Sequence, residues 1–118
     1  MSTILPRIPH EQIKVLILGE KYDLSIAFVM PAKARALNKK YRKKSYVPDT
    51  LAFPLSKNAG EIVLNISAIK REAKGHNEPL AHFATRLFIH SCLHLKGLTH
   101  GPRMEREERR IMKKHYRT

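Results

Sequence analysis

The chain has a single cysteine, no long apolar run and few acidic residues. With Cys92 alone among 118 residues, a disulfide framework or a closed metal site built on several thiolates is excluded within the chain. No stretch approaches the roughly 20 apolar residues of a membrane-spanning helix, and no charged and then apolar leader opens the sequence. We therefore expect a protein without a membrane segment that works in the reducing cytoplasm.

The shortage of acidic residues gives the chain a strongly basic character. Lys and Arg number 23 against 10 Asp and Glu, so the formal net charge is +13. Such a charge favours polyanionic partners, nucleic acid first and an anionic membrane surface second. The length and the 42% hydrophobic content predict one globular domain over residues 1–118, without internal repeats.

Three histidines stand at metal-ligand spacing between residues 90 and 100. If residues 79–96 are helical, His90 and His94 lie one turn apart on the same face. Gly97 suits the left-handed position that ends such a helix, and a reversal there can carry His100 back towards the other two. Three histidines with a fourth position left to water are typical of a catalytic zinc site. The sequence thus predicts one zinc ion, the alternative being that these histidines are ordinary surface or core residues.

Ser91 and Cys92, the two residues after His90, limit which further ligands and which reactions the predicted zinc site can have. Cys92 lies about 200° around the helix from His90, so it points away from the metal and is expected to be a small buried residue. The spacing matches the zincin pattern H-E-x-x-H-x-x-G-x-x-H except that Ser91 replaces the glutamate. A metalloprotease needs that carboxylate as its general base, so Ser91 disfavours peptide hydrolysis.

Apolar periodicity and turn residues predict alternating helices and strands. Helices are expected over residues 10–19, 31–44, 67–74, 79–96 and 103–117, and strands over 24–30, 50–53 and 61–66, with at most a short edge strand in 1–9. The strand 24–30 is expected to be buried, Pro54 to end the second strand, Asn77 to cap the metal-bearing helix and Tyr41 to lie in the core. This order of elements favours an α/β or α+β sandwich, a small mixed sheet covered by helices with the metal-bearing helix at its centre.

Three segments together resemble the YbeY family, the endoribonucleases and ribosomal-RNA maturation factors of bacteria and organelles. The family's metal motif, H-G-x-L-H-L-x-G-x-D-H, is similar to H-S-C-L-H-L-K-G-L-T-H at 90–100. Its N-x-x-Y-R and T-D-V-L-S-F-P segments are similar to residues 38–42 and 48–54, and its G-D-I-V-I strand to residues 60–64. The departures are Ser91 for Gly, Thr99 for Asp and Ala52 for Ser.

The resemblance implies an α+β fold with a mixed sheet and a zinc ion on His90, His94 and His100. It also places Arg42 at the family's functional arginine, and we take Arg42 and His94 as the catalytic residues. The implied function is a zinc-dependent, single-strand-specific endoribonuclease that matures the 3′ end of 16S ribosomal RNA and serves ribosome quality control. Its expected partners are single-stranded and ribosomal RNA and the small ribosomal subunit.

The chemistry of phosphodiester hydrolysis fits this residue set. Zinc can lower the pKa of its water to about 7 or bind a phosphate oxygen as a Lewis acid, and Arg42 offers a planar, charged fork for phosphate. Asp49 and Glu61 are the candidates for a general base. The basic segment 33–44 and the C-terminal Arg and Lys clusters would hold the RNA backbone, and Tyr41 or Tyr46 would stack on a base. The alternative function is a non-catalytic, RNA-binding ribosome-assembly factor with a structural zinc, for which Arg42 is one more solvated cation.

Overall fold

The computed structural model describes residues 6–116, which form five helices and three strands. In chain order these are α1 His10–Leu18, β1 Asp23–Val29, α2 Pro31–Arg42, β2 Thr50–Ser56, β3 Ala59–Asn65, α3 Ile66–Gly75, α4 Leu80–Lys96 and α5 Pro102–His115. Within this part of the chain, no helix is both long enough and apolar enough to cross a lipid bilayer.

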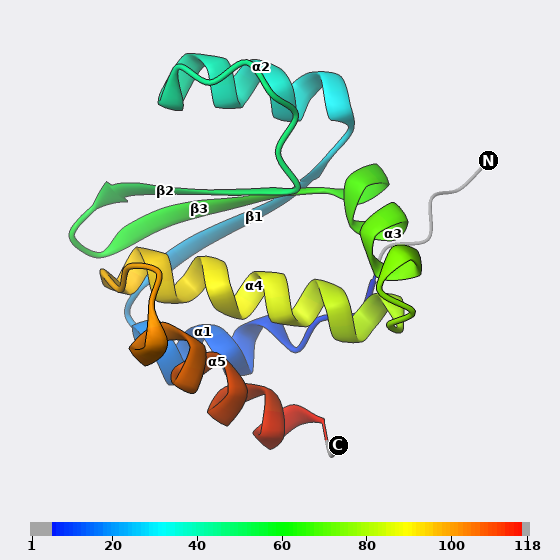
Figure 1. Cartoon of the computed structure of the whole chain (residues 1–118). Helices are drawn as coiled ribbons and strands as arrows, with labels where there is room; N and C mark the ends of the chain where they lie inside the picture. Colours follow the sequence, from blue (N-terminus) through cyan, green and yellow to red (C-terminus); the bar gives the residue numbers. More distant parts are fainter. Residues whose placement is uncertain (1–5, 117–118) are drawn as a thin grey trace.

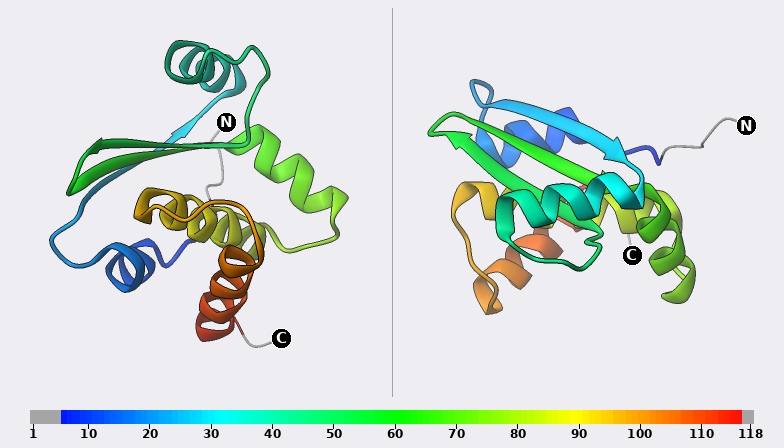
Figure 2. Two further views of the ribbon diagram at one scale, coloured as in Figure 1. Left: turned by 60° about the vertical axis from the view of Figure 1, so that its left-hand side comes forward. Right: turned by 90° about the horizontal axis from the view of Figure 1, so that it is seen from above.

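The strands form one mixed sheet with β3 at its centre. β3 runs parallel to β1 and antiparallel to β2. Helix α2 covers one face of the sheet, whereas α4 lies against the other face with α1 and α5 beyond it (Figures 1 and 2). Because both faces are covered, the middle of β3, Ile62 to Leu64, is almost wholly inaccessible to solvent. The expected α+β fold with a mixed sheet is confirmed.

Helix α4 is the central element, as predicted. It contacts α1, α3, α5, β2 and β3, and its apolar residues recur at helical spacing along more than one face. Phe88 and Ile89 are completely buried, and each such side chain contributes about 1.5–3 kcal/mol of transfer free energy. The helix that carries two of the three predicted metal ligands is therefore held firmly from several sides.

Both edge strands differ in detail from the expectation. β1 contains no fully buried residue, because it lies at the edge of the sheet with β3 as its strand neighbour. The continuous apolar run therefore predicted a strand correctly, but it did not predict that the strand lies at the edge of the sheet. β2 continues through Pro54 to Ser56, with a register shift between these residues, because an edge strand loses little when proline removes one N–H group. The connection between the two predicted strands, residues 54–60, is thereby reduced to a turn at residues 57–58.

The predictions for Asn77 and Tyr41 are wrong. Asn77 adopts a left-handed φ of 54° and its N–H group donates to the carbonyl of Lys74, so it ends α3 rather than capping α4. Tyr41 is 56% exposed and its ring lies 4.8 Å from that of Phe53, because α2 turns other residues towards the sheet. Of the edge strand expected in residues 1–9, residues 1–5 lie outside the described part and residues 6–9 form no strand.

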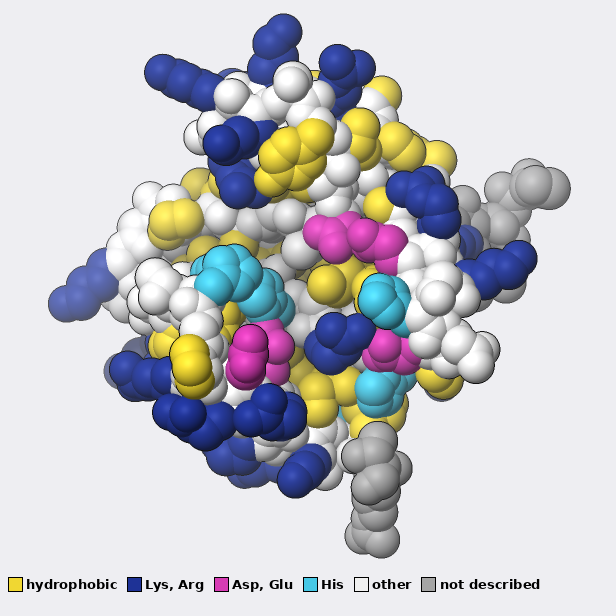
Figure 3. Space-filling view, in the orientation of Figure 1, with side chains coloured by type: hydrophobic (Ala, Val, Ile, Leu, Met, Phe, Trp, Pro, Cys, Tyr) yellow, Lys and Arg dark blue, Asp and Glu magenta, His cyan; other side chains and the backbone are white. Residues whose placement is uncertain are grey.

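Positive charge gathers over two elements on one face of the molecule. Lys and Arg side chains cluster over α2 and over α5, and a group of histidines lies between the two clusters (Figure 3). The excess of cations seen in the sequence is thus visible on the face of the molecule that Figure 3 shows.

Candidate metal centre

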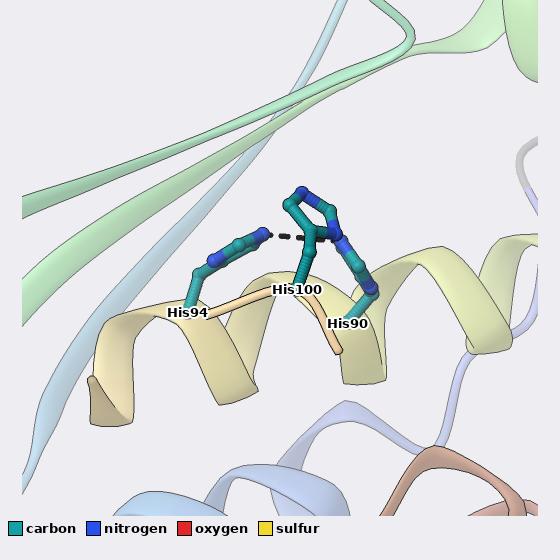
Figure 4. Close-up of side chains that lie close together, drawn as sticks. All are labelled: His90, His94 and His100. Atoms are coloured by element: carbon teal, nitrogen blue, oxygen red, sulfur yellow. Dashed lines mark hydrogen bonds between the residues drawn. The ribbon is translucent and has the colours of Figure 1, made fainter. Parts of the chain in front are cut away.

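The structure brings His90, His94 and His100 to one point. His90 and His94 project from the same face of α4, and α4 ends at Gly97 in the left-handed conformation, with φ of 109°. The chain then reverses so that His100 faces the two helical histidines (Figure 4). The ring centroids lie 4.6 to 4.9 Å apart, and one nitrogen from each ring lies within 4.8 Å of the other two. Among the described residues this is the one such group of potential metal ligands.

Hydrogen bonds on the far side of two rings orient their metal-facing nitrogens. Nδ1 of His90 donates to the carboxylate of Glu108, and Nδ1 of His94 donates to the carbonyl of Leu98 at 3.2 Å. With the protons on Nδ1, the Nε2 atoms carry lone pairs, and these two atoms face each other at 3.1 Å. Two lone pairs so close together repel each other, and a cation bound by both nitrogens would remove this repulsion, so the donor set fits a metal ion.

The protonation state of His94 also suits a ligand. Burial lowers the pKa of His94, and the neighbouring His90 and His100 lower it further, although Leu98 and Glu108 act in the opposite direction. A lowered pKa keeps the imidazole neutral at physiological pH, and the neutral form is the one that binds metals.

Ser91 and Cys92 do not complete the site. The hydroxyl of Ser91 is buried, donates to the carbonyl of Leu87 at 3.0 Å and lies 3.0 Å from the hydroxyl of Thr50, so it joins α4 to β2. Cys92 is fully buried, and burial raises the pKa of its thiol to about 12. Neither residue offers a general base or a fourth ligand.

A cavity of about 740 Å³ opens over the three histidines. Arg42, at the end of α2, lines this cavity together with the three imidazoles, and so does the half-exposed Tyr46. Among the described residues, Arg42 has no carboxylate within ion-pair distance. Its guanidinium is therefore available to an anion that enters the cavity.

Two carboxyl groups, Asp49 and Glu72, line the same cavity. Asp49 was one of the two candidate bases, whereas Glu61, on β3, is not part of the lining. Glu72 was missed, because nothing in the sequence of α3 shows that it faces Asp49. Burial raises the pKa of Glu72, and the charge of Asp49 and a hydrogen bond to it add to this effect, which the nearby Arg71 partly offsets.

Glu108 is the other residue that the sequence reasoning missed, although a signal for it exists. Met104, Ile111 and Met112 form the buried seam of α5, and Glu108 falls on the same stripe at helical spacing. A carboxylate at a core position of an amphipathic helix needs a polar partner, and here the partner is His90.

Comparisons with known proteins agree with these observations. The profile of a family described as "Endoribonuclease YbeY" matches residues 2–118. Proteins named Endoribonuclease YbeY from Thiobacillus denitrificans and Aromatoleum aromaticum are 33% and 38% identical over 78% and 73% of this chain, which cover 69% and 58% of the relatives. A relative of the same name from Pelotomaculum thermopropionicum is 29% identical over 97% of the chain and 80% of its own length.

A solved structure shows the same fold. The solution structure of a protein from Thermotoga maritima has a TM-score of 0.65 and 22% identity, and the match covers 87% of this chain and 73% of that one. Because the chain spans little more than half the length of some curated relatives, such as the 58% in Aromatoleum aromaticum, the activity of the whole relatives is a matter for proposal. The match over residues 2–118 and these relatives show that the chain belongs to the YbeY family of endoribonucleases.

Proposed function

We propose that this chain is a single-domain, metal-dependent endoribonuclease that hydrolyses phosphodiester bonds in single-stranded RNA. The observation that carries the proposal is the shared cavity, which is lined by three convergent imidazoles, by two carboxyl groups and by Arg42, for which the described part of the chain offers no ion-pair partner. His90, His94 and His100 would hold one zinc ion. When bound, zinc would supply a Lewis acid for activating water or polarising a phosphate oxygen.

The remaining residues bind and orient the RNA and move protons. Arg42 would hold the non-bridging oxygens of the scissile phosphate with its planar fork. Tyr46, 52% exposed at the wall of the cavity, would stack on a base, which suits single-stranded RNA because its bases are free. The raised pKa of Glu72 lets its carboxyl group keep a proton over a wider pH range, so it is our candidate for donating a proton to the leaving oxygen.

The finer part of the proposal concerns the biological substrate. The single cysteine supports a role in the reducing cytoplasm. The motif resemblance supports a role in maturing the 3′ end of 16S ribosomal RNA on the small ribosomal subunit and in ribosome quality control. The net charge of +13 supports a large polyanion as partner. A precursor RNA that carries the unprocessed 3′ end, cut at one discrete site, would support this role over general RNA degradation.

The direct test is cleavage of single-stranded RNA by purified protein loaded with one equivalent of zinc. His94→Ala should abolish cleavage, with His115→Ala as a control outside the cavity. Arg42→Lys keeps the charge but loses the fork, so the rate should fall by about 10–100-fold for one charge-assisted bond. Lys57→Ala, which removes an exposed charge outside the cavity lining, should change the rate little. Cleavage that persists in His94→Ala would point to a contaminating nuclease and contradict the proposal.

A second candidate is a non-catalytic RNA-binding assembly factor with a structural zinc. The observation in its favour is Thr99, which replaces the carboxylate next to the third histidine of the family motif. This candidate predicts RNA or ribosomal-subunit binding without turnover and a melting temperature that falls sharply when a chelator is added. Zinc-dependent turnover lost in His94→Ala would exclude it.

A further inference from the structure

The outer face of α5 carries a stripe of cations that the proposed catalytic function does not use. Its members recur at the i, i+3, i+4, i+7 and i+8 positions of one helix face and line a shallow hollow of about 520 Å³; they are Arg106, Arg109, Arg110, Lys113 and Lys114. All five are exposed. We call this set the α5 cationic face. The opposite side of the helix is the apolar seam, which is buried in the protein.

The acidic residues of α5 do little to neutralise this face. Glu107 pairs with Arg110 at 2.7 Å, and Glu108 is turned inwards to His90. Within the described residues, the other four cations have no carboxylate at ion-pair distance. Like charges three or four residues apart destabilise a helix, so an anionic ligand along the stripe would relieve a repulsion already present.

The cations of α5 lie on the opposite side of the metal centre from those of α2 (Figure 3). A second hollow of about 290 Å³ between α4 and α5 shares His90 and His100 with the main cavity and is bordered by Glu105 and Glu108 of α5. In the space-filling view, cations lie over α2 on one side of the histidines and over α5 on the other (Figure 3). The two cationic surfaces therefore flank the metal centre.

We propose that the α5 cationic face is a second binding surface for RNA, which holds backbone phosphates of the segment that leaves the cavity while α2 holds the other side. The inference rests on the proposed function in taking RNA as the ligand. The longest dimension of the molecule is 34 Å, and a stacked strand advances about 3.4 Å per nucleotide, so a strand of about 10 nucleotides would reach across. Only RNA of that length or more would use both surfaces.

The chemistry of the face favours RNA over other anionic partners. A helix that binds a membrane surface needs an exposed apolar side, whereas the apolar seam of α5 is buried against the protein. A protein partner would need buried aromatic or apolar anchors, and the stripe itself consists of cations alone. Evenly spaced point charges suit a repeating phosphate backbone.

The test compares two triple variants in RNA binding. Arg106→Gln/Arg109→Gln/Lys113→Gln removes three charges from the face, and Lys21→Gln/Lys57→Gln/Lys74→Gln removes three exposed charges elsewhere. Fluorescence anisotropy would follow a 20-nucleotide and a 6-nucleotide single-stranded RNA between 50 and 200 mM salt, with the metal chelated so that no RNA is cut. For the 20-mer, the slope of log K against log salt should fall by about 2 in the α5 variant, at about 0.7 for each lost phosphate contact. The control variant should lower this slope for the 20-mer by clearly less. For the 6-mer, the slope should change equally in both variants.

Equal binding of the 20-mer by the two variants would overturn the inference, as would an equal loss for the 6-mer and the 20-mer in the α5 variant. Binding to phosphatidylserine vesicles that depends on the α5 charges, with no effect on RNA, would overturn it in favour of a membrane surface. Should the triple variant lose helicity, Arg109→Gln alone should still lower the slope by about 0.7. Because binding is measured without cleavage, a wild-type protein that fails to cut RNA with zinc would contradict the proposed function and leave this comparison intact.

Discussion

Glu108 offers the sharpest test of the metal centre, because it touches a predicted ligand from a different helix. Its carboxylate accepts a hydrogen bond from Nδ1 of His90, which fixes the ring and increases the donor strength of Nε2. Removing such a partner of a metal-binding histidine typically weakens metal binding by about 10–100-fold. We therefore expect Glu108→Ala to weaken zinc binding by this amount, and Glu108→Gln, which keeps an acceptor without the charge, to fall between Ala and the wild type.

The expected loss of zinc affinity can also be read as a loss of stability. A 10–100-fold change in affinity is about 1.4–2.7 kcal/mol. Zinc that binds only the folded protein stabilises it, and the stabilisation grows with zinc affinity. At a fixed and saturating zinc concentration, zinc should therefore stabilise the variant by about 1.4–2.7 kcal/mol less than the wild type. At about 4 °C per kcal/mol for a chain of this size, the zinc-induced rise in Tm should be about 5–10 °C smaller in Glu108→Ala.

Two measurements check this prediction. Competition with a chromogenic chelator gives the zinc affinity, and thermal melts with and without zinc give the change in Tm, with the zinc-free melt reporting any loss of helix packing. Glu107→Ala is the matched control, because Glu107 pairs with Arg110 on the surface and should alter zinc affinity by less than about twofold. The reasoning is refuted if Glu108→Ala and Glu107→Ala bind zinc equally well.

Three further predictions concern Glu72, Cys92 and Thr99. Burial and the neighbouring Asp49 raise the pKa of Glu72 in the folded protein above its value in the unfolded chain. The contribution of Glu72 to the free energy of unfolding is therefore complete when the pH is below the unfolded-state pKa, and it is lost as the pH rises through the folded-state pKa. Glu72→Gln should thus resist urea better than the wild type at pH 7 and equally at about pH 4; equal resistance at pH 7 would contradict this. The buried Cys92 thiol, with a pKa of about 12, should react with iodoacetamide at pH 8 only after unfolding, and rapid labelling of the native protein would show that the thiol is accessible. Thr99 is exposed, so a carboxylate placed there is screened by water, and Thr99→Asp should change zinc affinity by less than about fivefold. A change as large as that of Glu108→Ala would show that position 99 reaches the metal.

Local patterns predicted most of the fold, because each depends on neighbours along the chain. Apolar periodicity identified the central helix, in which Phe88 and Ile89 are completely buried, and Gly97 identified its left-handed end. The errors arose where tertiary position decides the outcome. The apolar run of β1 looks the same at an edge as at the centre of a sheet, and Pro54 is compatible with a strand only because β2 is also an edge.

In the candidate site too, contacts between residues close in sequence could be predicted, whereas contacts between distant elements could not. His90, His94 and His100 lie within eleven residues of sequence, so helix geometry and one glycine were enough to predict that they would meet. Contacts between distant elements were out of reach. The sequence does not reveal that Glu72 of α3 faces Asp49, a residue that precedes β2, because that contact depends on how α3 packs beside the sheet.

The position of Glu108 affects how the replacement at Thr99 is interpreted. Of the three departures from the family motif, Thr99 is the strongest argument against an active enzyme. In the family motif an aspartate precedes the third histidine, and its loss removes a carboxylate from the metal loop. In this structure the seam of Met104 and Ile111 packs α5 against α4 and thereby places the carboxylate of Glu108 on His90. An acidic partner for the metal-facing histidines therefore comes from helix packing rather than from the loop. Because a carboxylate is still present beside the ligands, the threonine gives weaker support to a purely structural metal than the sequence suggested.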